Sequence, residues 1–164
     1  MKTLPRRRRG GYFPPVAGAP SPVEIRVERR VAFSEADPMG ILWHGRYAAS
    51  FEQANEALGR RCGLSYEAFI EHRLGAPVVQ FHVDYFSSPA LGENVAIKAR
   101  FVWSEGARLN IEYEILRADG ILAATGYTVQ MLVSAATGEP LLVSPPLLEE
   151  CRRKWRAGEF AEEN

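Results

Sequence analysis

The chain has 164 residues, of which 46% are hydrophobic and 24% are charged. These values are typical of one globular domain, and they exclude a chain that is disordered throughout, a fibrous repeat and a coiled coil. The formal net charge is zero, but residues 1–30 carry +6 and residues 31–164 carry −6. A basic N-terminal arm therefore precedes an acidic body.

A membrane span, a secretory signal and a metal site are not expected. The longest uncharged stretch, residues 120–138, is interrupted by Ser, Thr and Gln, whereas a span needs about 20 mostly apolar residues. The basic N-terminus lacks the apolar segment of a secretory signal. Cys62 and Cys151 show no metal-ligand spacing, alone or with the histidines, and are expected to be reduced thiols of a cytoplasmic protein.

The first predicted unit is a flexible arm over residues 1–22. The four arginines at positions 6–9 repel one another, and five prolines oppose regular structure. Residues 23–164 are expected to form a single domain. It begins with a strand over residues 23–33, where apolar residues alternate and Arg29 is the exception, followed by a loop over residues 34–45.

The next predicted elements are helical. Residues 46–61 predict a long helix, because apolar residues recur at steps of three and four, and Gly63 can end it. Ser65 predicts the N-cap of a short second helix that ends at His72. The apolar stripe of the long helix consists of Tyr47, Phe51, Ala54, Leu58 and Cys62.

The second half of the chain predicts strands joined by short connections. Alternation or continuous apolar character marks four of them, and the last is long enough to be a central strand. Short connections favour antiparallel neighbours, so we predict an α+β domain with one antiparallel sheet packed on one long helix. The four strands are residues 79–85, 95–103, 109–115 and 121–133, and residues 147–156 can form a closing helix.

The loop before the long helix holds the side chains best suited to chemistry. Asp37 lies seven residues before His44, close to the expected helix start. Backbone N–H groups at a helix N-terminus can stabilise an oxyanion. A nearby carboxylate can act as a nucleophile or a general base, and His44 can donate through its ring or its backbone N–H. Both residue types are also common in turns without chemistry, so the two interpretations remain open at this point.

This segment resembles the motif of the hotdog-fold acyl-CoA thioesterases, in the group of the 4-hydroxybenzoyl-CoA thioesterases and their YbgC-like relatives. In that motif a Gly stands three residues after an Asp and precedes an aliphatic pair. A Tyr or His stands seven residues after the Asp, and an aromatic residue ten after it. The resemblance continues through the helix, residues 75–79 and the strand order, over about residues 24–145. The matching residues are Asp37, Gly40, Ile41, Leu42, His44 and Tyr47.

The resemblance implies a hotdog fold, with a sheet of about five strands wrapped around one long helix, and hydrolysis of an acyl-CoA thioester to the free acid and CoA. Asp37 would be the catalytic carboxylate, as nucleophile or general base. The backbone N–H of His44 would polarise the thioester carbonyl, and its imidazole ring is a second donor. Gly40 would permit the tight turn. No metal or organic cofactor is implied.

The helix offers a second-choice acid or base, Glu52. A second group of thioesterases takes its carboxylate from the helix, and Glu52 lies five residues after Tyr47. A solvated or salt-bridged surface residue is the alternative. Glu35, two residues before Asp37, also fits the resemblance, because an acidic residue is frequent there.

The phosphates of CoA predict basic residues near the site. Lys98, Arg100 and Arg108 are candidates, together with Ser104 in the turn that precedes Arg108; solvated edge charges are the alternative. The acyl pocket is expected to be aromatic and to take an aromatic or a short- to medium-chain acyl group. Its candidate residues are Trp43, Tyr47, Phe51, Phe81 and Tyr85.

Two other functions stay open. The first is a hotdog domain that senses acyl-CoA without catalysis and uses the arginines at positions 6–9 on nucleic acid. The second is a hotdog dehydratase or hydratase, although Asp37 followed by Pro38 and a distant His44 departs from the pattern of those enzymes. For the leading function the expected partners are acyl-CoA, or a carrier-protein thioester, and further copies of this chain. The resemblance implies a dimer or a tetramer of two dimers with shared active sites; nucleic acid is not an expected partner.

Overall fold

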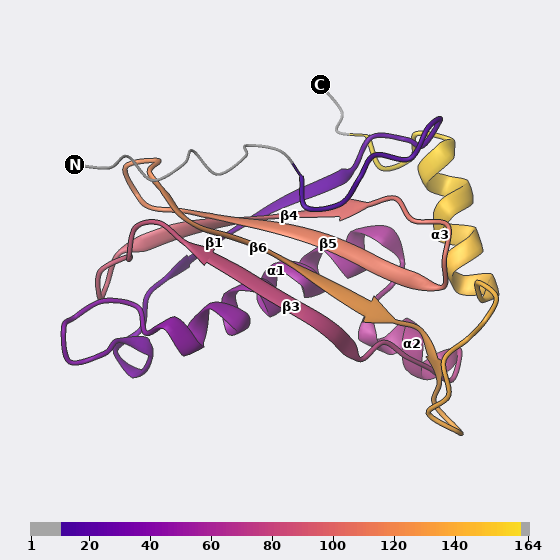
Figure 1. The fold of residues 1–164 in the computed structure, drawn as a ribbon, viewed down its shortest axis with the longest axis horizontal. Helices are drawn as coiled ribbons and strands as arrows, with labels where there is room; N and C mark the ends of the chain where they lie inside the picture. Colours follow the sequence, from indigo (N-terminus) through magenta and orange to yellow (C-terminus); the bar gives the residue numbers. More distant parts are fainter. Residues whose placement is uncertain (1–10, 162–164) are drawn as a thin grey trace.

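The computed structural model describes residues 11–161 and contains one antiparallel sheet packed against a long helix (Figure 1). This confirms the α+β hotdog arrangement expected from the sequence. The five strands of the sheet are β1 (Val23–Arg30), β3 (Val78–Tyr85), β4 (Asn94–Val102), β5 (Arg108–Leu116) and β6 (Leu122–Met131). The helices are α1 (Tyr47–Cys62), α2 (Tyr66–Glu71) and α3 (Pro146–Arg156).

The strand order in the sheet is β1-β4-β5-β6-β3, and all neighbours run antiparallel. β5 is therefore the central strand, and β6, expected to be central, lies between β5 and the edge strand β3. Within the described part of the chain, β3 pairs along one side with β6, and its other side carries no strand. A separate pair joins β2 (Leu74–Gly75) to β7 (Val133–Ser134).

The long helix α1 buries the predicted stripe against the sheet. Phe51 stacks on Tyr113 of β5 with ring centroids 4.3 Å apart. Gly126 of β6 makes room for this stack, because a Cβ at that position would lie 2.6 Å from the Phe51 ring. The helix ends at Gly63, whose φ of 73° is the left-handed conformation of a C-cap glycine. Ser65 caps α2 as predicted, accepting a hydrogen bond from the Ala68 N–H at 3.2 Å.

The predicted closing helix is confirmed as α3, which packs over the β4–β5 turn (Figure 1). Arg152 donates hydrogen bonds to the carbonyl oxygens of Ser104 and Gly106 in that turn. Arg156 lies over the Trp103 ring, with its guanidinium carbon 4.6 Å from the ring centroid. These contacts hold α3 at one end of the sheet. No helix in residues 11–161 is long and apolar enough to cross a membrane.

The N-terminal segment differs from the flexible arm expected from the sequence. Residues 11–22 lie against the outer face of the sheet, the face turned away from α1, where Tyr12 and Phe13 make specific contacts with β3, β5 and β6. They form no helix or strand, as five prolines in the first 22 residues predict. Sequence reasoning missed the docking because these contacts come from residues about 70 to 110 positions away. Residues 1–10, which include the four consecutive arginines, lie outside the described residues.

Candidate active site

The loop between β1 and α1 folds into a compact turn around Asp37. The Asp37 N–H donates to the Ile41 carbonyl and the Gly40 N–H donates to the Asp37 carbonyl, both at 2.9 Å. Gly40 has a φ of 74°, a conformation that favours glycine, so the role expected for it is consistent with the structure. The Met39 N–H donates to Asp37 Oδ1 at 2.8 Å. The carboxylate is therefore held in one orientation and is partly exposed.

Two side chains anchor this loop to the rest of the domain. Arg29, the charged exception on the inner face of β1, forms an ion pair with Glu35 and donates a hydrogen bond to Ser50 Oγ of α1 at 3.0 Å. Burial alone would raise the pKa of Glu35, but hydrogen bonds from Arg29 and from the Ala32 N–H outweigh it and lower the pKa below its usual value. The anchor thus joins β1, the Asp37 loop and α1.

His44 lies where the loop enters the helix. Residues His44–Arg46 form a 3-10 turn, and α1 starts at Tyr47, one residue later than predicted. The N-cap residue of α1, Arg46, makes no side-chain capping hydrogen bond. The Tyr85 hydroxyl at the end of β3 donates to the His44 carbonyl at 3.1 Å. This bond ties the loop to the edge strand.

A neighbouring glycine that the sequence analysis did not single out shapes this turn. A Cβ on Gly45 would lie 2.4 Å from the indole ring of Trp43, so glycine is required for the observed position of the ring. Trp43 remains 44% exposed and lies beside His44, with ring centroids 5.1 Å apart. Trp43 is therefore a partly exposed aromatic residue beside His44, as expected for a pocket residue.

The structure does not support a pocket lined by Tyr47 and Phe51 within one chain. They are 2% and 1% exposed, because the stripe to which they belong faces the sheet. Tyr47 packs edge-on against Tyr85, with centroids 4.8 Å apart, and Phe51 belongs to the core stack. Both side chains therefore belong to the core between α1 and the sheet. Phe81 and Tyr85 on β3 lie on the same side of the sheet and are about half exposed.

A cavity of about 340 Å³ lies at the other end of α1, under its C-terminal half and α2. Sequence reasoning did not identify it, because it is formed by segments that each read as ordinary core. Asn55, Ser65, Tyr66 and Gln130 add polar groups to a lining that is otherwise mostly apolar. The apolar lining includes Leu58, Leu64, Phe69, Ile70, Leu74 and Ala76.

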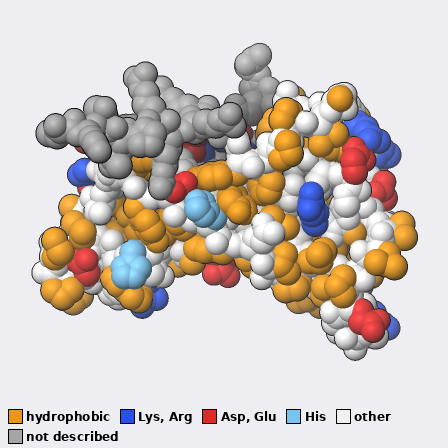
Figure 2. All heavy atoms as spheres, in the orientation of Figure 1, with side chains coloured by type: hydrophobic (Ala, Val, Ile, Leu, Met, Phe, Trp, Pro, Cys, Tyr) orange, Lys and Arg blue, Asp and Glu red, His pale blue; other side chains and the backbone are white. Residues whose placement is uncertain are grey.

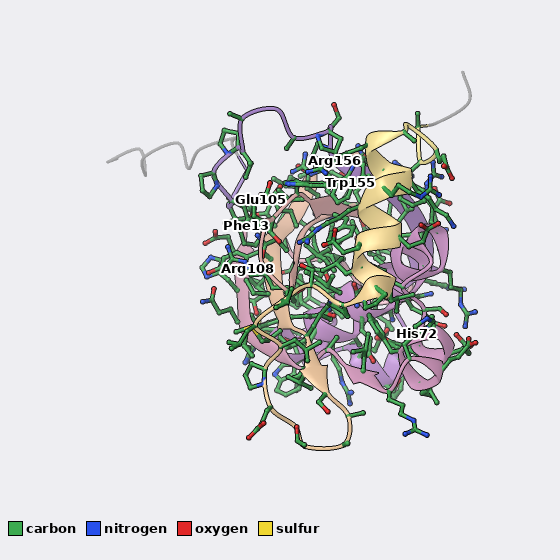
Figure 3. All side chains as sticks on the ribbon, turned by 90° about the vertical axis from the view of Figure 1, so that its right-hand side faces the viewer. Phe13, His72, Glu105, Arg108, Trp155 and Arg156 are labelled. Atoms are coloured by element: carbon green, nitrogen blue, oxygen red, sulfur yellow. The ribbon has the colours of Figure 1, made fainter. Side chains whose placement is uncertain are left out.

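Two of the residues proposed for CoA, Ser104 and Arg108, lie at the same end as this cavity. Figure 3 looks onto this end of the molecule and shows Arg108 and Glu105 in the region of the sheet next to α3. Ser104 is buried, and its hydroxyl donates to the Arg108 carbonyl at 3.1 Å, whereas the Arg108 side chain is exposed. The Asp37 loop is at the opposite end of the sheet (Figure 1), where Ile41 bridges to Ala90 before β4. The nine residues of β4 separate the two ends by about 30 Å.

The remaining predicted residues lie outside both regions. Arg100 lies on the outer face of the sheet and is paired with Glu112 at 3.1 Å and Glu114 at 3.9 Å, and Lys98 is paired with Glu24 at 3.6 Å. These ion pairs provide a structural role for both cations.

Glu52, the second-choice acid or base, is exposed on α1. Burial first, and then the negative charges of Glu52 and Glu56, raise the pKa of Tyr66 at the cavity. The structure places Asp37 and Gly40 in one turn and His44 where this loop meets α1, whereas Ser104 and Arg108 lie at the opposite end of the sheet within one chain (Figure 1).

Comparison with known proteins identifies the family. The family model described as the thioesterase-like superfamily matches residues 31–151. The acyl-CoA thioester hydrolase YbgC of Escherichia coli is 21% identical over 124 residues, which cover 76% of this chain and 92% of that protein.

Solved structures agree with this match. A DHNA-CoA thioesterase from Staphylococcus aureus superposes with a TM-score of 0.74 at 28% identity, over 86% of this chain and 96% of that one. Another S. aureus protein, solved in complex with CoA, superposes with a TM-score of 0.73 at 16% identity, over 87% and 88% of the two chains. The chain described here belongs to the thioesterase-like superfamily.

Proposed function

We propose that this protein hydrolyses an acyl-CoA thioester to the free acid and CoA. The observation that carries the proposal is the position of Asp37, a carboxylate oriented by its own turn in the loop that leads into α1. The named activities of YbgC and of the S. aureus DHNA-CoA thioesterase support the same reaction.

The chemistry follows from Asp37 and the backbone N–H of His44. As a nucleophile, Asp37 attacks the thioester carbonyl, the C–S bond breaks, CoA leaves as a thiolate, and water then hydrolyses the resulting anhydride. As a general base, Asp37 instead takes a proton from a water molecule whose oxygen attacks the carbonyl, and the departing thiolate receives that proton. In both routes the carbonyl oxygen becomes an oxyanion, and the backbone N–H of His44 donates to it.

We further propose that two chains pair through β3. An edge strand with one open side is a ready template for another strand. Phe81 and Tyr85 on the inner face of β3 are 48% and 50% exposed, and hydrophobic side chains are prominent on the face of the molecule shown in Figure 2. A two-fold axis at this edge would pair the two β3 strands antiparallel and cover these residues.

This pairing would bring the Asp37 loop of one chain close to the cavity of its partner. Tyr85, at the end of β3, contacts His44, whereas Gly75 and Ala76, just before β3, line the cavity. Antiparallel pairing places the end of one β3 beside the start of the other. The catalytic loop of one chain would then lie beside the cavity of its partner, and the acyl group would enter that cavity. Its volume and apolar lining favour an aromatic or a short- to medium-chain acyl group, with exposed Arg108 available for CoA phosphates.

The test is release of free thiol from a panel of acyl-CoA esters, with the wild type and Asp37→Asn side by side. The panel spans benzoyl, hydroxybenzoyl, phenylacetyl, short-chain and long-chain esters. We expect release that depends on Asp37 and is fastest for aromatic or short- to medium-chain esters. An absence of release from every ester, by a protein that still binds CoA, would replace the hydrolase with the acyl-CoA sensor.

A further inference from the structure

Residues 11–22 contact the outer face of the sheet at one end and α3 at the other (Figure 1). Figure 3 shows Phe13 and His72 of the α2 region on opposite sides of the molecule. One end of the segment is anchored at Tyr12 and Phe13. At the other end, the Trp155 indole N–H of α3 donates to the Ser21 carbonyl at 2.7 Å. We call residues 11–22 the N-terminal cap.

Tyr12 bridges two strands of the sheet. Its hydroxyl donates to Asp84 Oδ2 of β3 at 2.9 Å and forms a hydrogen bond with Thr125 Oγ1 of β6. Asp84 and Thr125 are register partners across these strands. Burial chiefly, together with the negative charge of Asp84, raises the pKa of Tyr12 to about 12, so the phenol stays neutral and remains a donor at physiological pH.

Glu112 of β5 forms the second contact with the cap. Its carboxylate accepts the N–H groups of Tyr12 and Phe13 and an ion pair from Arg100, although the residue is only 4% exposed. Without the cap it would keep only Arg100 of these three partners, and an incompletely paired buried charge is costly. Gly11 allows this approach, because a Cβ there would lie 2.7 Å from Glu112 Oε1.

The cap also covers the aromatic part of this face. The Tyr12 ring packs against Tyr127 and His82, with centroids 5.0 and 5.6 Å away, and the Phe13 ring packs against Tyr127 at 5.3 Å. Val129, which shares this face with Tyr127 on β6, is buried although its side chain points away from α1. The apolar residues that a second chain would need at the core of an interface are therefore already in use.

We propose that the N-terminal cap closes the outer face of the sheet to a second copy of this chain, so that assembly stops at the β3-paired dimer. The inference rests on the dimer in the proposed function. A stable interface buries about 800 Å² on each partner around an apolar core, and the capped face does not offer such a core. The tetramer of two dimers implied by the family resemblance is therefore not expected of this chain.

The first test is native mass spectrometry and light scattering of the full-length protein. We expect twice the 18.3 kDa mass of one chain. A tetramer would overturn the proposed limit of two chains, and cross-links between the outer faces would show that residues 11–22 do not close that face. The proposed reaction and the β3 pairing would stand in either case. A monomer would overturn the β3 dimer and with it the proposed limit of two chains. Loss of thiol release without a change in mass bears on the reaction alone, so the failures are distinguishable.

The second test removes the anchor while the rest of the chain is kept. In the Tyr12→Ala/Phe13→Ala variant we expect faster amide hydrogen exchange in β6 around Tyr127 and the appearance of species larger than a dimer. Gly11→Val should act in the same direction with both rings present, because its Cβ meets the Glu112 carboxylate. Phe33→Ala, at an aromatic residue that is 85% exposed, is the matched control and should change neither. Faster exchange in a protein that remains strictly dimeric would overturn the proposal.

Discussion

Two aspartates of this chain make the same local hydrogen bond in different surroundings. Asp37 Oδ1 accepts the N–H of Met39 at 2.8 Å, and Asp119 Oδ1 accepts the N–H of Ile121 at 3.0 Å. Asp119 belongs to the β5–β6 turn, whereas Asp37 belongs to the loop that leads through the 3-10 turn His44–Arg46 into α1. Substituting each aspartate in turn therefore distinguishes its contribution to the stability of the turn from its contribution to catalysis.

We therefore expect Asp37→Asn to lower kcat by about a thousandfold, because it removes the nucleophile or base. The amide keeps the shape and the acceptor oxygen, so the melting temperature should not change. Asp119→Asn should leave both kcat and melting temperature at wild-type values. Thiol release and thermal unfolding of the three proteins check this, and an Asp37→Asn variant with most of its activity would move the catalytic role to Glu52.

The Arg29–Glu35 pair predicts a pH-dependent part of the stability. Since folding lowers the pKa of Glu35, its contribution is fully present above the unfolded pKa of about 4.3 and is lost as the pH falls through the folded pKa. At pH 7 we expect Glu35→Gln to lower the free energy of unfolding by about 2 kcal/mol.

Urea unfolding at pH 7 and pH 3 measures this effect. The difference between wild type and Glu35→Gln should be smaller at pH 3 than at pH 7, because at pH 3 the carboxyl group is protonated in the unfolded chain and part of the stabilisation is lost. Glu28→Gln, in the exposed Arg26–Glu28 pair of the same strand, is the control and should cost much less at pH 7. An equal difference at the two pH values would show that Glu35 does not act through its charge.

At the scale of single residues, the local sequence points to candidate catalytic residues, but it does not reveal hydrogen-bond and ion-pair partners that are distant in the sequence. The spacing of Asp37, Gly40 and His44 singled out the loop before α1; in the structure Asp37 and Gly40 share one turn and His44 starts the 3-10 turn that leads into α1. In the sequence, Arg29 stood out only as a charged residue in an alternating apolar pattern. Its ion pair with Glu35 could not be predicted, because it forms only when the loop folds back against β1. Tyr12 was missed for the same reason, since Asp84 and Thr125 are 72 and 113 positions away.

At the scale of elements, strong periodicity was sufficient for α1 and for the five strands of the main sheet. The short β2–β7 pair was not predicted, because two-residue strands carry no periodic signal. The cavity was not predicted either. It lies among α1, α2, β2 and the sheet, and its volume depends on how these elements pack rather than on any one of them.

The cavity carries a prediction about acyl selectivity. Ala76→Phe places a larger side chain in the lining just before β3, so we expect KM to rise and kcat/KM to fall with acyl length while short esters such as acetyl-CoA are spared. Ala136→Phe, at an exposed position in the turn after β7, is the control and should keep the wild-type profile. A profile unchanged by Ala76→Phe would exclude the cavity as the acyl site without affecting the role of Asp37.

At the scale of the whole molecule, the two parts of the proposed thioesterase site lie far apart within one chain. Asp37 and the start of α1 lie at one end of the sheet, and the cavity and Arg108 lie at the other. The sequence pattern could not predict the distance between the Asp37 loop and the cavity, because that distance depends on how β4 and α1 run through the folded domain. The exposed apolar edge at β3 connects the two ends only if a second chain is present.

This geometry predicts complementation between two defective chains. Asp37→Asn lacks the reactive carboxylate but keeps the cavity, and Ala76→Phe keeps the carboxylate but obstructs the cavity for longer acyl groups. In a mixed dimer, one of the two sites joins the intact carboxylate of one chain to the intact cavity of the other. With random pairing, half of the dimers are mixed, so co-expression should restore about a quarter of wild-type activity on longer esters, while each variant alone is inactive. If the carboxylate and cavity of the same chain worked together, every site in the mixed dimers would carry a defect and no activity would return. Thiol release from co-expressed and separately expressed variants, with dimer formation verified by mass, decides between a shared site and a site within one chain.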